Sequence, residues 1–170
     1  MRIAASQTGI RKMSQQPESI EKLAAVFGGP SQSAFGSAVF HEKLPDGDLE
    51  QAALAKYRAF VGKLWDQYGE KAWTEPWKEV HVRDPGNSAD IVSELRQITD
   101  RDALLSVPML LDSIENADTA KAALSDVFDD PGVNELRVFA IGDGEAMSGI
   151  LIAALRSDSG EATFLVFLMD

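Results

Sequence analysis

The clearest helical periodicity in the chain lies between residues 49 and 68. Apolar side chains recur there at spacings of three and four residues, which places them along one side of a helix. The stripe consists of Ala53, Leu54, Tyr57, Phe60, Val61, Leu64, Trp65 and Tyr68. Asp46 or Asp48 can cap the N-terminus, and Gly69 suits the C-terminus. The pattern predicts one continuous amphipathic helix that buries this stripe in the core.

Shorter segments with the same periodicity lie on either side of that helix. Pro17 suits a first helical turn, and the segment that begins there ends at the pair Gly28 and Gly29. Ser88 can cap another short helix, and Pro108 is expected to break the helical stretch in which it lies. The helices predicted from these signals cover residues 17–27, 89–98, 99–114 and 118–128.

From residue 135 onward the period of the pattern changes from helical to alternating. Three apolar runs of strand length follow one another, at residues 135–141, 149–156 and 162–169. Gly160 can adopt positive φ in a hairpin loop between the last two runs. Both alternating faces of the last run are apolar, which is typical of a strand covered on both sides. These runs predict an antiparallel three-stranded meander.

The predicted fold class is α+β. Two weaker strand signals precede the meander, at residues 37–44 and 77–84. Helices in the N-terminal two thirds are expected to pack on an antiparallel sheet that is formed mainly by the C-terminal meander and joined by the second of these strands.

The length of 170 residues fits a single domain. Met13 opens a segment that resembles an alternative start. We therefore expect residues 1–12 to be a disordered leader and residues 13–170 to form one globular α+β domain.

The segment GDGE at residues 142–145 connects the first two runs of the meander and admits several interpretations. A dinucleotide-binding loop needs a third glycine where Met147 stands, and the carboxylates of Asp143 and Glu145 would repel phosphate. Those carboxylates could instead hold calcium or magnesium, although their spacing matches no established loop. A third alternative makes residues 146–156 a helix between parallel strands. We predict the simplest arrangement, a turn followed by a strand.

The composition describes an acidic globular protein. The chain has 27 acidic residues against 16 Lys and Arg, and its formal net charge is -11. This charge argues against binding to nucleic acid or to an anionic membrane, because both need a basic footprint. No apolar run approaches the ~20 residues of a membrane span. Because there is no cysteine, thiol chemistry is excluded, a reducing compartment is favoured, and we expect a cytoplasmic protein.

Acidic residues are concentrated between residues 112 and 145, where nine acids accompany two bases. One interpretation is a solvated surface. The other is a docking face for a basic protein, since complementary charge raises association rates and specificity. The candidate partner-binding acids are Asp129, Asp130, Asp143 and Glu145.

Aromatic residues and histidines supply the remaining candidates. Trp73 and Trp77 flank a short connection, where they could pack in the core or anchor a partner. Trp77 and His81 could instead line the mouth of a ligand pocket between helix 49–68 and the sheet. Neither His81 nor His41 belongs to a metalloprotease or serine-hydrolase motif. No metal or cofactor is expected.

The leading functional hypothesis is therefore a non-enzymatic acidic cytoplasmic protein that binds a basic protein partner. Immunity, inhibitor and adaptor proteins are of this kind. One alternative is a small-molecule-binding domain or small enzyme that uses the pocket at Trp77 and His81. Another is a homo-oligomeric structural protein in which the edge of the sheet pairs with its copy.

Overall fold

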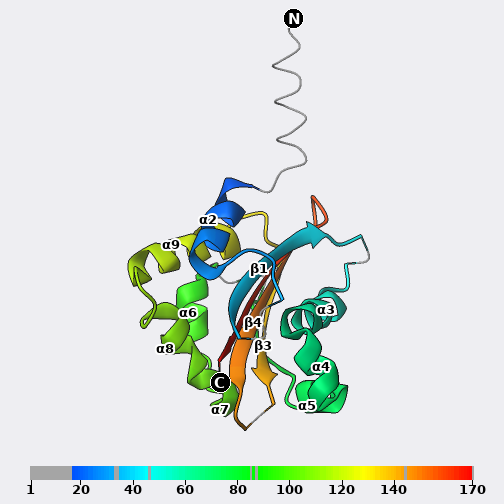
Figure 1. Cartoon of the computed structure of the whole chain (residues 1–170). Helices are drawn as coiled ribbons and strands as arrows, with labels where there is room; N and C mark the ends of the chain where they lie inside the picture. The colour runs from blue at the N-terminus through cyan, green and yellow to red at the C-terminus, as the bar shows by residue number, and fades with distance from the viewer. Residues whose placement is uncertain are drawn as a thin grey trace, which may run out of the picture.

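The computed structural model describes residues 17–32, 35–45, 47–84, 86, 88–143 and 145–169. It contains a five-stranded antiparallel sheet between two layers of helices (Figure 1). The spatial order of the strands is β1-β5-β4-β3-β2. The strands are β1 (Gly36–Lys43), β2 (Lys78–Val82), β3 (Glu135–Gly142), β4 (Ser148–Arg156) and β5 (Glu161–Met169). The predicted α+β class and the C-terminal meander are confirmed, and β1 and β2 add one strand on each side of the meander.

The helices divide between the two faces of the sheet (Figure 1). One face carries α2 (Glu18–Phe27), α6 (Ile91–Arg96), α7 (Arg101–Leu104), α8 (Ser106–Leu111) and α9 (Ala117–Phe128). The other face carries α3 (Leu49–Val61), α4 (Lys63–Tyr68) and α5 (Glu70–Thr74). The predicted leader at residues 1–12, the start at Met13 and the capping candidate Asp46 lie outside the described residues.

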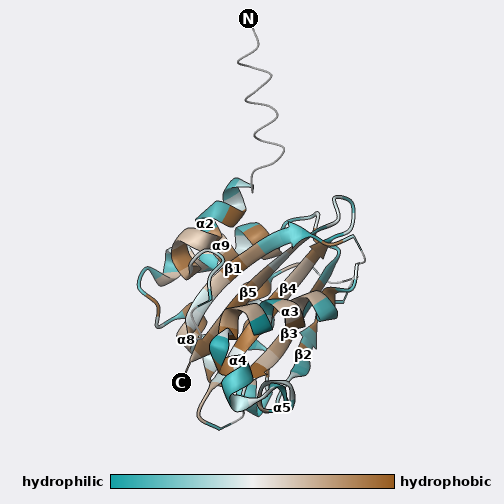
Figure 2. Ribbon diagram, turned by 45° about the vertical axis from the view of Figure 1, so that its right-hand side comes forward, coloured by the Kyte–Doolittle hydropathy of each residue, from teal (hydrophilic) through white to brown (hydrophobic). Residues whose placement is uncertain are grey.

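Alternation along the central strands separates the core into two parts. Val138 and Ile152 pack under α2 and α6–α9, whereas Phe139 and Leu151 pack under α3–α5. In β4 and β5 nearly every residue is buried, and Figure 2 shows these strands as predominantly hydrophobic. The prediction that the last strand is covered on both faces is confirmed.

The helix predicted over residues 49–68 is not continuous. It is interrupted at Gly62, which has φ 67° and separates α3 from α4. Asp48 caps α3 by accepting a hydrogen bond from the backbone N–H of Gln51. Tyr68, at the end of α4, is 55% exposed, so its assignment to the core was wrong.

The break predicted near Pro108 falls earlier, at Leu105, between α7 and α8. Pro108 lies in the first turn of α8, where a missing backbone N–H removes no helical hydrogen bond. Proline is therefore compatible with the start of this helix and does not interrupt it.

The connection between β3 and β4 is a turn organised by Asp143. Its Oδ1 accepts hydrogen bonds from the backbone N–H groups of Glu145 and Met147. Gly142 precedes it with φ 125°, and a Cβ there would collide with the Met147 carbonyl group. The predicted turn and following strand are confirmed, and the helical alternative for residues 146–156 is excluded by β4.

Candidate functional site

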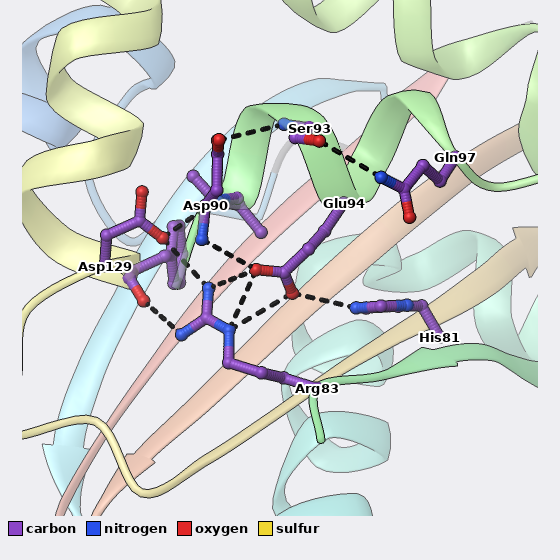
Figure 3. A network of polar contacts seen from close by, with 9 residues as sticks. His81, Arg83, Asp90, Ser93, Glu94, Gln97 and Asp129 are labelled. Atoms are coloured by element: carbon purple, nitrogen blue, oxygen red, sulfur yellow. Dashed lines mark hydrogen bonds and ion pairs between the residues drawn. The ribbon is translucent and has the colours of Figure 1, made fainter. Parts of the chain in front are cut away.

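A polar groove of about 470 Å³ lies between the end of β2 and α6. Its side chains come from both elements and from the connection between them. They include His81, Arg83, Asp90, Ser93, Glu94 and Gln97. A hydrogen-bonded network organises this groove (Figure 3).

Glu94 is the centre of the network. Its carboxylate accepts hydrogen bonds from Arg83 Nε at 2.9 and 3.1 Å, and from the backbone N–H of Asp90 at 2.9 Å. His81 Nε2 lies 2.8 Å from Glu94 Oε1 (Figure 3). Burial alone would raise the pKa of Glu94, but hydrogen bonds from Arg83, Asp90 and His81 outweigh it and hold the pKa below its ordinary value. Glu94 is therefore kept ionised and is unsuited to act as a general acid.

Arg83 connects Glu94 on α6 to the end of α9. Its Nη1 donates to the Phe128 carbonyl oxygen at 2.7 Å, and its Nη2 donates to Asp129 Oδ1 at 2.9 Å. The same oxygen of Asp129 accepts the backbone N–H of Ile91 at 2.8 Å. The Arg83 side chain is 10% exposed, and its guanidinium binds a carboxylate on each side. This network joins β2, α6 and α9, and it pairs the one guanidinium of Arg83 with two carboxylates, those of Glu94 and Asp129.

His81 and Trp77 lie on opposite faces of the sheet, so the predicted pocket between them is not formed. A bulge between Glu79 and His81 shifts the register of β2, and His81 lies opposite Val138, on the face covered by α6. The Trp77 ring stacks on Phe139 with centroids 4.5 Å apart, on the face covered by α3.

The second tryptophan candidate is also placed differently from the prediction. Trp73 lies within α5 and is 0% exposed. Its indole N–H donates to the Leu64 carbonyl oxygen at 3.1 Å. Trp73 lies on a helix and not in an open connection. Of the two roles left open by the sequence, it packs in the core and has no exposed surface with which to anchor a partner.

The four candidate acids do not form one face. Asp129 and Asp130 precede β3, whereas Asp143 and Glu145 follow it, and eight residues of strand span roughly 25 Å. Asp130 is engaged internally, since its carboxylate binds Arg156 and the backbone N–H of Gly132. Asp143 holds its turn. Glu145 is exposed and has no ion-pair partner within the described ranges.

A surface feature that the sequence analysis missed lies beside Glu145. Exposed apolar side chains gather at the corner between α7 and α8, and we call them the α7–α8 patch. They are Leu104 (48% exposed), Leu105 (72%), Met109 (41%) and the exposed Pro108. A groove of about 220 Å³ adjoins this patch, and its lining includes Leu105, Asp102 and Glu145. The segment ALLSVPML, residues 103–110, has no polar face, and this sequence feature indicates that some of its apolar side chains stay exposed.

Comparison with protein-family models, curated proteins and solved structures finds no match for this chain. Within the described part of the chain, no group of three or more His, Cys, Asp or Glu residues has a geometry that could hold a metal ion. In the same residues no helix reaches the length and hydropathy of a membrane span.

Proposed function

We propose that this protein is a non-enzymatic binding protein for a basic protein partner in the cytoplasm. The observation that carries the proposal is the α7–α8 patch beside Glu145. The homo-oligomeric alternative remains a prediction.

Exposed apolar side chains that cluster are typical of protein-binding surfaces, because single exposed apolar residues are scattered on most proteins. In this patch Leu105 is 72% exposed, although it stands between two helices that are otherwise anchored in the core. Ala103 and Leu110, which flank the patch in sequence, are fully buried. The corner therefore presents apolar side chains on a rigid support, and a partner that covered them would gain hydrophobic stabilisation.

Charge supports a basic partner. The chain has a formal net charge of -11, which favours association with cationic proteins and raises their association rate. Glu145 borders the groove next to Leu105 and is available to a cationic side chain. Asp102, on the same groove, is already bound to Lys78 at 3.0 Å. Arg101 also lines this groove and forms no ion pair among the described residues. Glu145 is thus the lining carboxylate left for a Lys or Arg of the partner, and its attraction has to outweigh the opposing charge of Arg101.

The experiment is capture of partners from the native lysate at low and high salt, with the wild-type chain and three variants as bait. We expect a basic protein that binds at low salt and is lost at high salt. Leu105→Ser and Glu145→Gln should each reduce its capture. Val82→Ser is the matched control, because Val82 is 45% exposed but lies on β2, away from the patch. Capture unaffected by Leu105→Ser, or no basic protein captured at either salt, would contradict the proposal.

A further inference from the structure

We propose that a hollow beside α3 and α4 binds a small molecule that carries a phosphate monoester. This site is independent of the proposed function, because α3 and α4 cover the opposite face of the sheet from α7 and α8. The hollow has a volume of about 420 Å³. We call it the Arg58 hollow, and its polar lining consists of Gln32, Arg58, Lys63, Trp65 and Asp66.

Two cations of this hollow lack a carboxylate partner. Neither Arg58 nor Lys63 forms an ion pair within the described residues, and both are exposed. Three other described basic residues, Lys43, Lys71 and Arg101, are also without an ion pair, but none of them lines this hollow. Eight others are paired with carboxylates, as expected in a chain with a large excess of acids. They are Lys22, Lys56, Lys78, Arg83, Arg96, Lys121, Arg137 and Arg156. Two uncompensated cations on one hollow therefore favour an anionic ligand.

The Arg58 guanidinium is held in place by an aromatic ring. Its central carbon lies 5.9 Å from the centroid of the Trp65 ring, which is within the range of a cation–π contact. This contact orients the guanidinium without neutralising it. A planar guanidinium recognises phosphate oxygens in pairs, whereas the Lys63 ammonium adds a point charge. Asp66 on the same lining and Glu70 on the neighbouring hollow oppose an anion, so binding depends on its contacts with Arg58 and Lys63.

Trp65 contributes a second, independent observation. Its Nε1 is buried and has no hydrogen-bond partner among the described residues. The indole N–H groups of Trp73 and Trp77, in contrast, donate to the Leu64 carbonyl oxygen and to Glu50. A buried donor without an acceptor is rare and costs free energy. Trp65 lines the hollow, and a ligand oxygen would reach this N–H only after the side chains around the indole move, because Nε1 is closed to water in this structure.

The break between α3 and α4 opens the hollow to a third segment of the chain. Gly62 has φ 67°, and a Cβ there would lie 2.5 Å from Gln32 Cγ. Gly62 thus allows the Gln32 side chain to cross the break and to place its amide on the hollow. Ala55 and Ala59 complete the lining with small apolar surfaces. This combination of cationic and amide donors with apolar walls fits a phosphate monoester of an apolar or aromatic group.

The proposal is tested by titrating the full chain with phenyl phosphate at low salt, by calorimetry and by following the indole N–H resonances of its three tryptophans. We expect saturable binding, and we expect the Trp65 resonance, assigned with Trp65→Phe, to move. Arg58→Gln and Lys63→Gln should each weaken binding about tenfold, since each removes a charge-assisted contact. Lys71→Gln is the matched control, because Lys71 is exposed on α5 and lines neither hollow.

Several results would overturn the assignment. Absence of saturable binding would remove the site, and binding that Arg58→Gln and Lys63→Gln leave unchanged would place it elsewhere. Sulfate or phenyl sulfate that binds as tightly as phenyl phosphate would show that the hollow accepts any anion. Phenol is the control for the apolar part alone, and equal binding of phenol would contradict recognition of the phosphate.

Discussion

The hydroxyl of Tyr57 closes a reciprocal contact with the backbone of Gly142. It accepts the Gly142 N–H at 2.9 Å and donates to the Gly142 carbonyl oxygen at 3.4 Å. Tyr57 is 0% exposed, and its ring contacts Trp65, Trp73 and Trp77. Burial raises the pKa of Tyr57 above its ordinary value, so the hydroxyl stays protonated and can donate. One side chain therefore connects α3 to the end of β3 within the part of the core that lies under α3–α5.

Tyr57→Phe is expected to destabilise the protein by about 1–3 kcal/mol, because it leaves the buried Gly142 N–H without an acceptor. The free energy of unfolding can be measured by urea denaturation. Tyr68→Phe is the matched control: Tyr68 is 55% exposed, and we expect its change to stay within about 0.5 kcal/mol. Equal stability of Tyr57→Phe and the wild type would contradict a structural role for this contact.

Gly142→Ala should destabilise the same region through the backbone. Gly142 has φ 125°, which side chains rarely adopt, and a Cβ there would collide with the Met147 carbonyl group. We expect a loss of about 1–3 kcal/mol or more in the free energy of unfolding. Gly86→Ala is a suitable control, since a Cβ at Gly86 would meet no atom of the described residues within 4 Å. A Gly142→Ala variant as stable as the control would show that the turn can rearrange without cost.

Glu94→Gln is expected to cost about 3 kcal/mol at neutral pH, because Arg83 would keep its charge and lose one of its two carboxylates. The loss should depend on pH. The folded pKa of Glu94 lies below its ordinary value, so its contribution is present above pH about 4.3 and is lost as pH falls through the folded pKa. The difference between the variant and the wild type should therefore shrink in acid.

Urea denaturation across that pH range measures this difference. Glu115→Gln is the control, since Glu115 is exposed and forms no ion pair among the described residues. A difference between Glu94→Gln and the wild type that is constant with pH would argue against stabilisation by the ionised carboxylate.

The burial of His41 predicts that the stability of the protein also depends on pH near neutrality. The His41 side chain is 6% exposed, and burial lowers its pKa against an opposing effect of Glu161, with Arg156 lowering it further. Because the unfolded chain then binds a proton more readily, stability should be fully present above pH about 6.5 and should fall as pH decreases below it. Thermal unfolding of His41→Gln should show a flatter pH profile than the wild type between about pH 7.5 and 5.5. Parallel profiles would exclude His41 as the origin.

Local patterns were sufficient to predict the strands, but not every helix, since α5 lies where a connection was expected. The alternation after residue 135 predicted β3, β4 and β5, because strand period depends only on neighbouring residues and on which faces are covered. The turn at Asp143 was predicted from its turn-forming residues, which are also local information. The interruption at Gly62 was not predicted, because a glycine inside an apolar stripe is compatible with a continuous helix. At the break, the side chain of Gln32, which comes from a distant segment, packs over Gly62.

The candidate site was less predictable than the fold. His81 and Trp77 are four positions apart in sequence, but the bulge in β2 places them on opposite faces, and a bulge has no reliable local signal. Asp129 was a candidate for binding a partner protein, but Arg83, 46 residues away, binds it within the chain. The exposure of Leu105 could not be predicted from the sequence either, since composition alone cannot distinguish an apolar helix in the core from one at a corner.

The sequence by itself determined the α+β class, the meander and the acidic character, because these depend on local period and on composition. Tertiary structure decided which charges remain uncompensated and which apolar side chains stay exposed. The physical reason is that ion pairs and burial depend on residues distant in the chain. Arg83 and Asp129 neutralise each other only when β2 meets the end of α9, whereas Arg58 and Lys63 stay unpaired because no described carboxylate comes within ion-pair distance of either.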